Sequence, residues 1–356
     1  MNYSQELSAT LHKVLAAEQK GLYEQAFTFL SPFWNTTSQF PITTNLSAEY
    51  SAELFLRCGG IIGFLGNSRQ ITNAQEISKD LLTEARHQFL SLFDFEKVAE
   101  CENYLALAYW RTGEFVEADD WLRESFSRNL PENNHVRLYS FVIEGLISLD
   151  KRKYEEIIVK SETQEEAFDK YADDFLKGCF NNQIGIAYKN LGMKYSALKH
   201  LKLARNFFQQ AGHQVYCGVT ENNLAQFFHS EGNFAEAHNS ANNARKIFEL
   251  LGDKTREGFS LETKAQIYSA EGKFDKALRY INDAIELLEK GESYMNLVES
   301  YRTKVKILIH LNRIAEALTV MTAAHNLASL HIAQDLAREI IENTAALIEE
   351  KLGEPK

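Results

Sequence analysis

A regular spacing of turn signals constrains this chain more than any other feature of its sequence. Six short turns, each a break between apolar segments, fall at Gly113, Arg152, Gly192, Gly232, Gly272 and Asn312. The steps between them are 39, 40, 40, 40 and 40 residues. Such spacing predicts one supersecondary unit copied along the chain, in which each copy packs on its neighbours.

The residues around each turn predict a pair of helices. In the unit that begins at Gly218, the segment from Phe234 to Leu251 has apolar side chains at steps of three and four residues, which fall on one helical face. Glu231-Gly232-Asn233 separates this segment from the preceding helix, around Val219 to Ser230, because glycine tolerates the left-handed conformation that ends a helix. We therefore expect one antiparallel hairpin per repeat.

The order of residue types within the unit resembles the tetratricopeptide repeat. An apolar and a small residue come first, an aromatic residue follows three positions later, and then a glycine and an alanine. The clearest copies are Leu105-Ala106 with Tyr109, Gly113 and Ala118; Ile184-Gly185 with Tyr188, Gly192 and Ala197; and Leu224-Ala225 with Phe228, Gly232 and Ala237. The resemblance implies an all-α, right-handed superhelical solenoid of seven or eight such hairpins. It also implies a protein that binds other proteins or peptides.

The expected organisation has three parts. Residues 1–94 form divergent hairpins with an irregular turn at Gly66-Asn67-Ser68, residues 95–332 form the regular array, and residues 333–356 hold a C-terminal capping helix, Ala333 to Leu352, and a tail. That terminal helix could instead pair with a second copy of the chain in a homodimer. Within the array, the unit around Arg152 is degenerate, because Ser148 replaces the aromatic residue and Ile157 replaces the alanine.

Composition excludes several classes of function. With 38 basic and 49 acidic residues the net charge is −11, which disfavours direct binding to nucleic-acid phosphates. No apolar run resembles a signal peptide or reaches the length of about 20 residues that spans a bilayer, so no membrane partner is expected. The four scattered cysteines (Cys58, Cys101, Cys179 and Cys217) indicate buried free thiols and a cytoplasmic protein.

A second resemblance is carried by short segments and covers most of the chain. Segments of certain bacterial regulators are similar to the run from Arg57-Cys58-Gly59-Gly60 to Ala74-Gln75-Glu76, to Lys97-Val98-Ala99-Glu100 with Tyr109-Trp110-Arg111, and to Glu221-Asn222-Asn223-Leu224. In those proteins a long tetratricopeptide array precedes a small helix-turn-helix. This sequence ends at Lys356 without one, so we expect either a regulator's input region or a stand-alone relative that acts through partners.

The resemblance also assigns candidate binding residues, because the first helix of each tetratricopeptide unit lines the concave groove. The equivalent groove positions are Asn103, Val142, Asn182, Asn222, Glu262 and Arg302. Carboxamides both donate and accept hydrogen bonds, so this ladder could bind the backbone of an extended peptide, as peptide-sensing bacterial repeat proteins do. Neighbouring candidates are Trp110, Arg111, Lys189, Asn190, Gln226, His229, Gln266 and Lys306. Alternatively, these side chains only solvate the inner face or cap helices.

No motif for catalysis, cofactor binding or metal binding is found. The sequence lacks G-x-x-x-x-G-K-[ST], G-x-S-x-G and H-E-x-x-H, so we predict a non-enzymatic scaffold without cofactor. Three alternatives remain open: an adaptor that captures a C-terminal carboxylate with Lys189 near Asn182 or Arg302 with Lys306, a structural spacer in a larger complex, and an enzyme with an unrecognised site.

Overall fold

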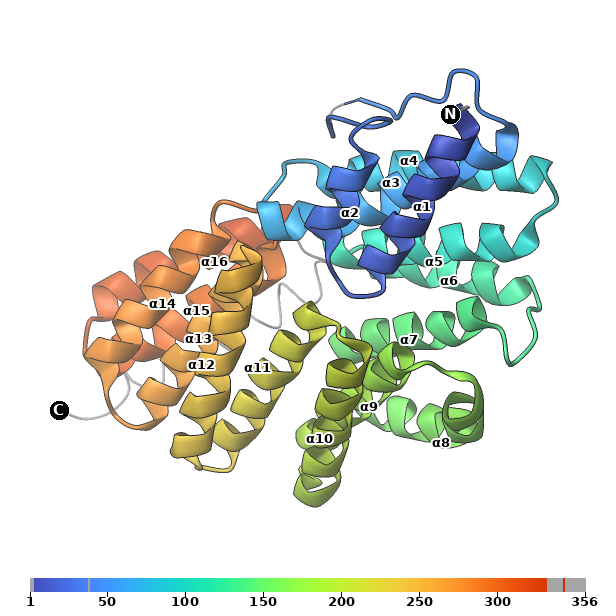
Figure 1. Ribbon diagram of the computed structural model, residues 1–356. Coiled ribbons are helices and arrows are strands. Elements are labelled where there is room, and N and C mark those ends of the chain that lie inside the picture. The colour runs from blue at the N-terminus through green and yellow to red at the C-terminus, as the bar shows by residue number, and fades with distance from the viewer. Residues whose placement is uncertain (1–2, 38, 332–341, 343–356) are drawn as a thin grey trace. The chain divides into compact units, whose positions relative to one another are not determined.

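The computed structural model describes residues 3–37, 39–331 and 342, and over these residues it is all-α (Figure 1). The predicted capping helix Ala333 to Leu352 therefore lies outside the described residues, apart from residue 342. The chain divides into two compact units. Unit 1 comprises Met1–Gly66 and Asn73–Thr220, and unit 2 comprises Asn67–Thr72 and Glu221–Lys356. The boundaries expected after residues 94 and 332 follow the repeat register and stay a prediction.

Successive helices pair into hairpins along the chain. The divergent hairpins are α1 (Tyr3–Glu18) with α2 (Tyr23–Leu30) and α3 (Ala48–Arg69) with α4 (Ala74–Ser91). The regular ones are α5 (Phe95–Thr112) with α6 (Phe115–Ser127), α7 (His135–Asp150) with α8 (Tyr154–Tyr171), α9 (Asp174–Asn190) with α10 (Lys194–Ala211), α11 (Gln214–Ser230) with α12 (Phe234–Leu251), α13 (Lys254–Ala270) with α14 (Phe274–Leu288), and α15 (Tyr294–His310) with α16 (Ile314–His331).

All six predicted turn residues have a left-handed backbone. The φ angles are 82° at Gly113, 75° at Gly192, 71° at Gly232, 73° at Gly272, 57° at Arg152 and 58° at Asn312. The residue after each turn residue closes the end of the first helix by a backbone bond, as from Asn233 N to Phe228 O at 2.9 Å. The equivalent bond from Lys153 N to Ser148 O is also 2.9 Å, so the degenerate repeat keeps the same turn.

The turn expected at Gly66-Asn67-Ser68 is wrong. These residues lie inside α3, which continues to Arg69, and the chain reverses between Gln70 and Asn73, where φ is 57° and 58°. Gly66 is needed for packing, because a Cβ atom there would lie 2.2 Å from the Cβ of Ala74 on α4. The glycine permits close approach of two helices and does not end one.

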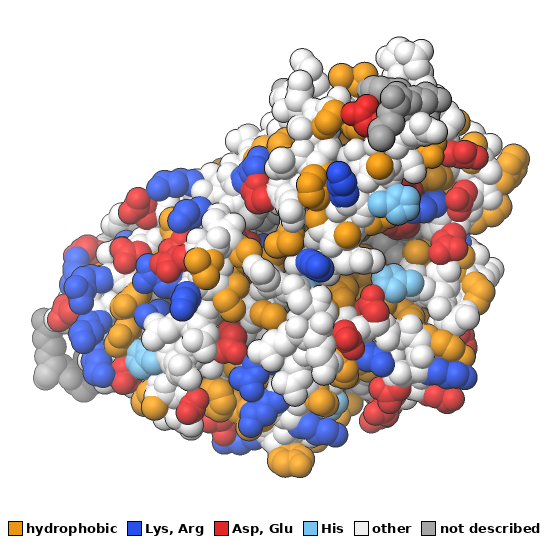
Figure 2. Space-filling view, viewed as in Figure 1, with side chains coloured by type: hydrophobic (Ala, Val, Ile, Leu, Met, Phe, Trp, Pro, Cys, Tyr) orange, Lys and Arg blue, Asp and Glu red, His pale blue; other side chains and the backbone are white. Residues whose placement is uncertain are grey.

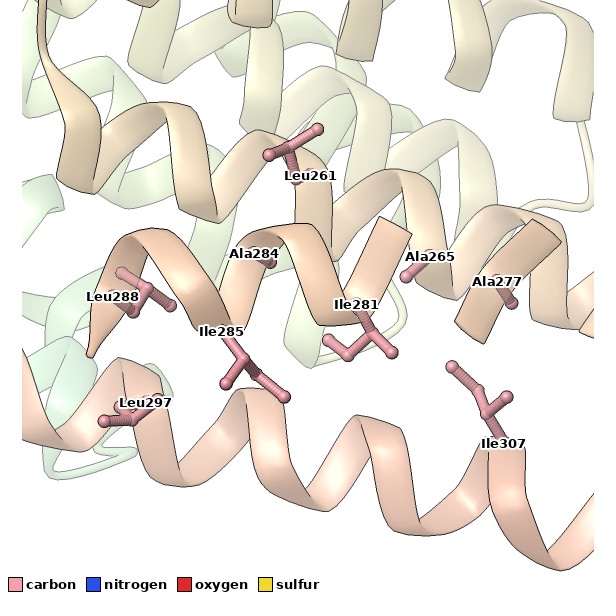
Figure 3. Packing of buried hydrophobic residues seen from close by; sticks show 9 residues of the cluster. All are labelled: Leu261, Ala265, Ala277, Ile281, Ala284, Ile285, Leu288, Leu297 and Ile307. Carbon is pink, nitrogen blue, oxygen red and sulfur yellow. The ribbon is translucent and has the colours of Figure 1, made fainter. Parts of the chain in front are cut away.

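Unit 2 has a core of small and branched apolar side chains between three helices. Figure 3 shows this cluster, with α14 between α13 and α15. Its members are Leu261 and Ala265 on α13, Ala277, Ile281, Ala284, Ile285 and Leu288 on α14, and Leu297 and Ile307 on α15. Full burial of a Leu or Ile side chain stabilises the fold by about 1.5–3 kcal/mol, whereas the alanines allow the helices to approach.

Unit 1 includes a contact between its first hairpin and a turn far along the sequence. The ring of Tyr23 on α2 stacks on Phe64 at 4.2 Å and lies edge-on to His213 at 6.5 Å. His213, in the turn between α10 and α11, is 2% exposed and stacks on Phe175 at 4.8 Å. A Cβ atom at Gly21 would lie 2.4 Å from the His213 ring, so the α1–α2 hairpin fits closely against this turn.

A buried charge cluster joins three helices of unit 1. Arg57 on α3, 2% exposed, pairs with Glu18 on α1 at 3.2 Å, with Glu53 at 3.0 Å, and with Glu100 on α5. Lys97 contacts Glu53 at 3.0 Å and Glu100 at 2.9 Å. Burial raises the pKa of Glu18 to about 7, whereas Arg57 and Lys97 outweigh burial and lower the pKa of Glu100 to about 2.

The four cysteines are free thiols, and Cys58, Cys101 and Cys179 are buried as expected. Cys217 is only half-buried, so the prediction of a buried thiol is wrong there. Among the described helices, none has the length and apolar character to cross a bilayer.

Candidate functional site

The predicted ladder lies on the first helices of successive repeats, and in unit 1 it begins with a structural residue. Asn103 on α5 is 0% exposed. Its Nδ2 donates to Val136 O on α7 at 3.0 Å, and its Oδ1 accepts from Ser140 Oγ at 2.9 Å. Both groups of the carboxamide thus join α5 to α7, and we leave Asn103 out of the proposed ligand contacts.

Glu262 makes the matching connection in unit 2. Its carboxylate accepts from Ser300 Oγ and Thr303 Oγ1 on α15, both at 3.1 Å, and from Gln266 Nε2 at 3.2 Å. Burial, aided by the Glu299 carboxylate, raises the pKa of Glu262 to about 7. The structure therefore brings together the predicted residues Glu262 and Gln266, and near neutral pH the carboxyl group can accept or donate a hydrogen bond.

Sequence reasoning missed the hydroxyl partners of this ladder. A serine or threonine stands twelve residues before the turn in four of the repeats, at Ser140, Thr220, Ser260 and Ser300. Ser140 and Ser300 donate to the ladder residue of the preceding repeat, which is Asn103 or Glu262. The recurrence of small hydroxyl residues at one register was the signal that could have identified them.

Asn222 on α11 is the exception in this ladder. It is 8% exposed, and its Oδ1 is buried with no hydrogen-bond partner among the residues that the structure describes. Ser260, at the register of Ser300, donates to Glu257 O at 2.8 Å within its own helix. A buried acceptor that lacks a partner costs about 1–3 kcal/mol, so this oxygen is a polar atom that the described part of the chain leaves unsatisfied.

Two more predicted residues follow Asn222 on α11. Gln226 and His229 are half-buried and stand four and seven residues later, the spacing that puts side chains on one helical face. Together with Asn222 they make a polar strip along the second half of α11 within unit 2.

The predicted residues on α9 of unit 1 differ in exposure. Asn182 is 6% exposed, Lys189 is half-buried, and burial lowers the pKa of the Lys189 ammonium group to about 8. Asn190 is exposed and donates to Ile186 O of its own helix at 2.9 Å. Asn190 thus behaves as a helix-end residue, whereas Asn182 and Lys189 are shielded from solvent.

Trp110 and Arg111 are engaged inside unit 1. The indole Nε1 of Trp110 donates to Asp150 Oδ2 at 2.7 Å, and burial raises the pKa of Asp150 to about 6 despite this bond. The guanidinium of Arg111 lies 4.3 Å from the ring centroid of Phe64, close enough for a cation–π contact. Both side chains therefore contribute to packing between helices.

The predicted cations of unit 2 lie on α15. Arg302 Nη1 contacts Glu299 at 3.2 Å, and Lys306 is exposed. Figure 2 shows acidic and basic side chains mixed over the viewed face. No group of three or more His, Cys, Asp or Glu side chains among the described residues is arranged to hold a metal ion.

The repeat pattern has a match among known families. Residues 216–290, which hold most of α11 and all of α12, α13 and α14, match the sequence model of the family described as Tetratricopeptide repeat. This stretch of the chain consists of tetratricopeptide repeats. Its turns, its paired helices and its small-residue contacts agree with that assignment. Among curated proteins, none matches the sequence significantly.

Solved structures show the same fold at low sequence identity. A Rap protein complexed with Competence and Sporulation Factor is similar with a TM-score of 0.62 and 14% identity, over 98% of this chain and 99% of that one. Aspartyl phosphate phosphatase F from Bacillus subtilis gives a TM-score of 0.58 and 14% identity, over 92% of this chain and 85% of that one.

A third similar structure is a signal transduction ATPase with numerous domains from Pyrococcus horikoshii, which carries a tetratricopeptide repeat sensor. The TM-score is 0.53 and the identity 15%, over 94% of this chain and 53% of that one. The chain thus spans about half the length of that ATPase.

Proposed function

We propose that this tetratricopeptide repeat protein is a non-enzymatic scaffold that binds a protein or peptide segment along the first helices of its repeats. The observation that carries the proposal is Asn222, whose buried Oδ1 has no partner among the described residues. A peptide N–H group is the donor that an extended ligand supplies at regular intervals.

The polar residues of unit 2 fit such a ligand. Gln226, His229 and Gln266 are half-buried donors and acceptors on α11 and α13, and Glu262 has a pKa of about 7. On α15, Arg302 and the exposed Lys306 offer positive charge to an acidic side chain or a terminal carboxylate of the same ligand. The binding segment then runs along α11, α13 and α15.

We further assign the protein to a bacterial, cytoplasmic regulatory system, as its sensory or adaptor part. The fold that it shares with a Rap protein complexed with Competence and Sporulation Factor, and with an ATPase that carries a tetratricopeptide repeat sensor, supports this role. Ligand binding would favour one arrangement of the stacked hairpins over another and so change what a partner protein contacts.

The test uses the full chain and a library of random peptides displayed on phage. Peptides selected on the wild-type protein are synthesised, and their affinities for Asn222→Ala and Asn239→Ala are measured by calorimetry. Asn239 is an exposed residue of α12 in the same repeat and serves as the matched control. We expect Asn222→Ala to weaken binding about tenfold or more, because it removes a buried acceptor, and Asn239→Ala to leave it unchanged.

Two results would contradict the proposal. Selected peptides that bind Asn222→Ala as tightly as wild type would show that the ladder does not contact the ligand. Failure to select any peptide, with the protein folded by circular dichroism, would favour the structural spacer.

A further inference from the structure

The hairpin of α7 and α8 differs from the other repeats at positions that face one another. Other repeats carry mostly apolar, aromatic or small residues at these positions. In α7 and α8 the same registers hold Glu144, Ser148, Ser161 and Gln164. At the register of Glu144 stand Leu105, Ile184 and Leu224, but also Lys264 and Lys304. At that of Ser148 stand Tyr109, Tyr188, Phe228, Tyr268 and Leu308. At that of Ser161 stand Leu122, Leu201, Ala241, Ile281 and Met321, and at that of Gln164 stand Ser125, Ala204, Ala244, Ala284 and Ala324.

These four residues line one recess between α7, α8 and α9. Its empty volume of about 360 Å³ counts space that is open to solvent, and the part that the centre of a water-sized sphere can enter is about 30 Å³. Phe141, Phe180 and Ile157 form apolar walls, and Lys160 lies among the polar lining residues. The second helix α8 contributes four lining residues, as many as α7, and α9 contributes three. The recess is therefore a different site from the ladder, which lies on first helices alone.

The sister repeats show what occupies this register. The ring of Tyr188 lies 5.6 Å from that of His200 on the second helix of its own repeat, and Tyr268 stacks on Tyr280 at 5.2 Å. Tyr188 and Tyr268 are half-buried, so each ring stands at the rim of its hairpin. In α7 and α8, Ser148 takes the place of the ring and Lys160 stands at the register of His200 and Tyr280.

A positive charge near the ring recurs in two of these repeats. The ammonium group of Lys79 lies 4.1 Å from the centroid of Tyr109, and those of Lys273 and Lys276 lie 5.9 Å and 5.7 Å from that of Tyr268. In the recess, Lys160 is placed by Glu144 at 2.7 Å and Glu156 at 2.8 Å. A ring that entered the recess would therefore meet an oriented cation.

We propose that this recess binds an aromatic side chain, a tyrosine or phenylalanine of a partner polypeptide, in the place that four sister repeats fill with an aromatic residue of their own. Phe141 and Phe180 contact the ring, Lys160 lies over its face, and the hydroxyl of Ser148 or the carboxamide of Gln164 bonds a phenolic hydroxyl. The degenerate repeat thus provides a second contact for a partner, independent of the ladder.

The experiment titrates the full chain with p-cresol, the side chain of tyrosine, and follows the methyl NMR signals of Ile157 and Ile184. We expect saturable shifts of these signals at millimolar concentrations of p-cresol. The comparison compound is 4-methylcyclohexanol, which has a similar size but no aromatic ring, and its affinity should be weaker by about tenfold. Equal affinity for the two compounds, or no shift with p-cresol, would overturn the proposal.

Two variants place a sister repeat's residue in the recess. Ser148→Tyr supplies the ring and Ser161→Leu supplies the leucine of the next repeat, so either one should remove p-cresol binding, and Ser148→Tyr should also raise the Tm. The control is Ser91→Tyr at an exposed serine of α4, which should bind p-cresol as wild type does. If Ser148→Tyr or Ser161→Leu is folded and still binds p-cresol with wild-type affinity, p-cresol binds elsewhere and the proposed site is refuted.

Discussion

Ser140 on α7 donates a 2.9 Å hydrogen bond to the carboxamide oxygen of Asn103 on α5. Ser300 on α15 makes the matching bond to Glu262 on α13 at 3.1 Å. In both places the ladder residue of one repeat bonds the hydroxyl residue of the next, within unit 1 and within unit 2. Part of the ladder therefore joins neighbouring repeats. Asn222, whose Oδ1 has no such bond among the described residues, is the ladder residue on which the proposed function rests.

Asn103→Ala is expected to lower the free energy of unfolding by about 1–3 kcal/mol, because it removes both carboxamide hydrogen bonds that join α5 to α7. The measurement is urea denaturation followed by circular dichroism. Asn190→Ala, which changes an exposed asparagine, should shift stability by less than about 0.5 kcal/mol. Equal effects of the two variants would show that the α5–α7 bond contributes nothing.

Glu262→Gln is expected to stabilise the protein at pH 8 and to have little effect at pH 4. The pKa of Glu262 is about 7 in the folded state, above its ordinary value of 4.5. The folded state therefore keeps a proton that the unfolded state has lost, and wild-type stability falls as pH rises from about 4.5 to about 7.

The glutamine does not titrate, so the gain at pH 8 should approach about 3 kcal/mol at most. Urea titrations at both pH values give the difference, with Glu286→Gln at an exposed carboxylate as the control. A difference between wild type and Glu262→Gln that does not change with pH would contradict this prediction.

Arg57→Met is expected to destabilise the protein by about 3–5 kcal/mol, because Glu18, Glu53 and Glu100 would remain in the fold without their shared cation. Glu18→Gln removes one buried carboxylate with a pKa of about 7, and it should be neutral or stabilising above that pH. Thermal unfolding at pH 8 compares the two variants. A loss on Glu18→Gln as large as that on Arg57→Met would mean that the ion pair outweighs the burial of Glu18.

Gly192→Ala and Gly185→Ala should each destabilise the protein, but for different reasons. A Cβ atom at Gly192 meets nothing within 4 Å, but φ is 75°, so the cost is the left-handed backbone, about 1–2 kcal/mol. A Cβ atom at Gly185 would lie 2.8 Å from Leu201 Cγ and 3.0 Å from its backbone nitrogen, which forces α9 and α10 apart.

Gly192→Asn tolerates the left-handed region and should recover much of the stability that Gly192→Ala loses. Leu201→Ala removes Cγ but not the backbone nitrogen, so it should restore part of the stability that Gly185→Ala loses and none of that lost by Gly192→Ala. Additive effects of Leu201→Ala with both glycine variants, measured as changes in Tm, would show that crowding is not the cause at Gly185.

The sequence predicted the repeats well because their turns depend on local chemistry. Left-handed residues recur at one register whether the side chain is glycine, arginine or asparagine, and the apolar spacing around them gives the paired helices. The all-α repeat fold followed from these signals. The turn predicted at Gly66 was wrong because a glycine that permits helix contact cannot be told in sequence from one that ends a helix.

The candidate site was less predictable, since its chemistry depends on contacts between repeats. The register that places Asn103 and Asn222 on first helices was visible, but nothing local distinguishes the one bonded to Ser140 from the one whose oxygen lacks a partner. In the sequence, Ser148 appears only as a departure from the repeat pattern. The recess beside it depends on how Phe141 and Phe180 pack, which the repeat pattern does not determine.

The contact between Tyr23 and His213 restricts how the gene for this protein could change. Solenoids commonly gain or lose whole repeats in evolution, since each copy touches only its neighbours. In unit 1, however, the first hairpin meets the turn after α10, with Gly21 fitted against the His213 ring. Duplication or deletion of a repeat between these points would break this contact, so a change of copy number within unit 1 carries a cost that an ordinary solenoid does not have.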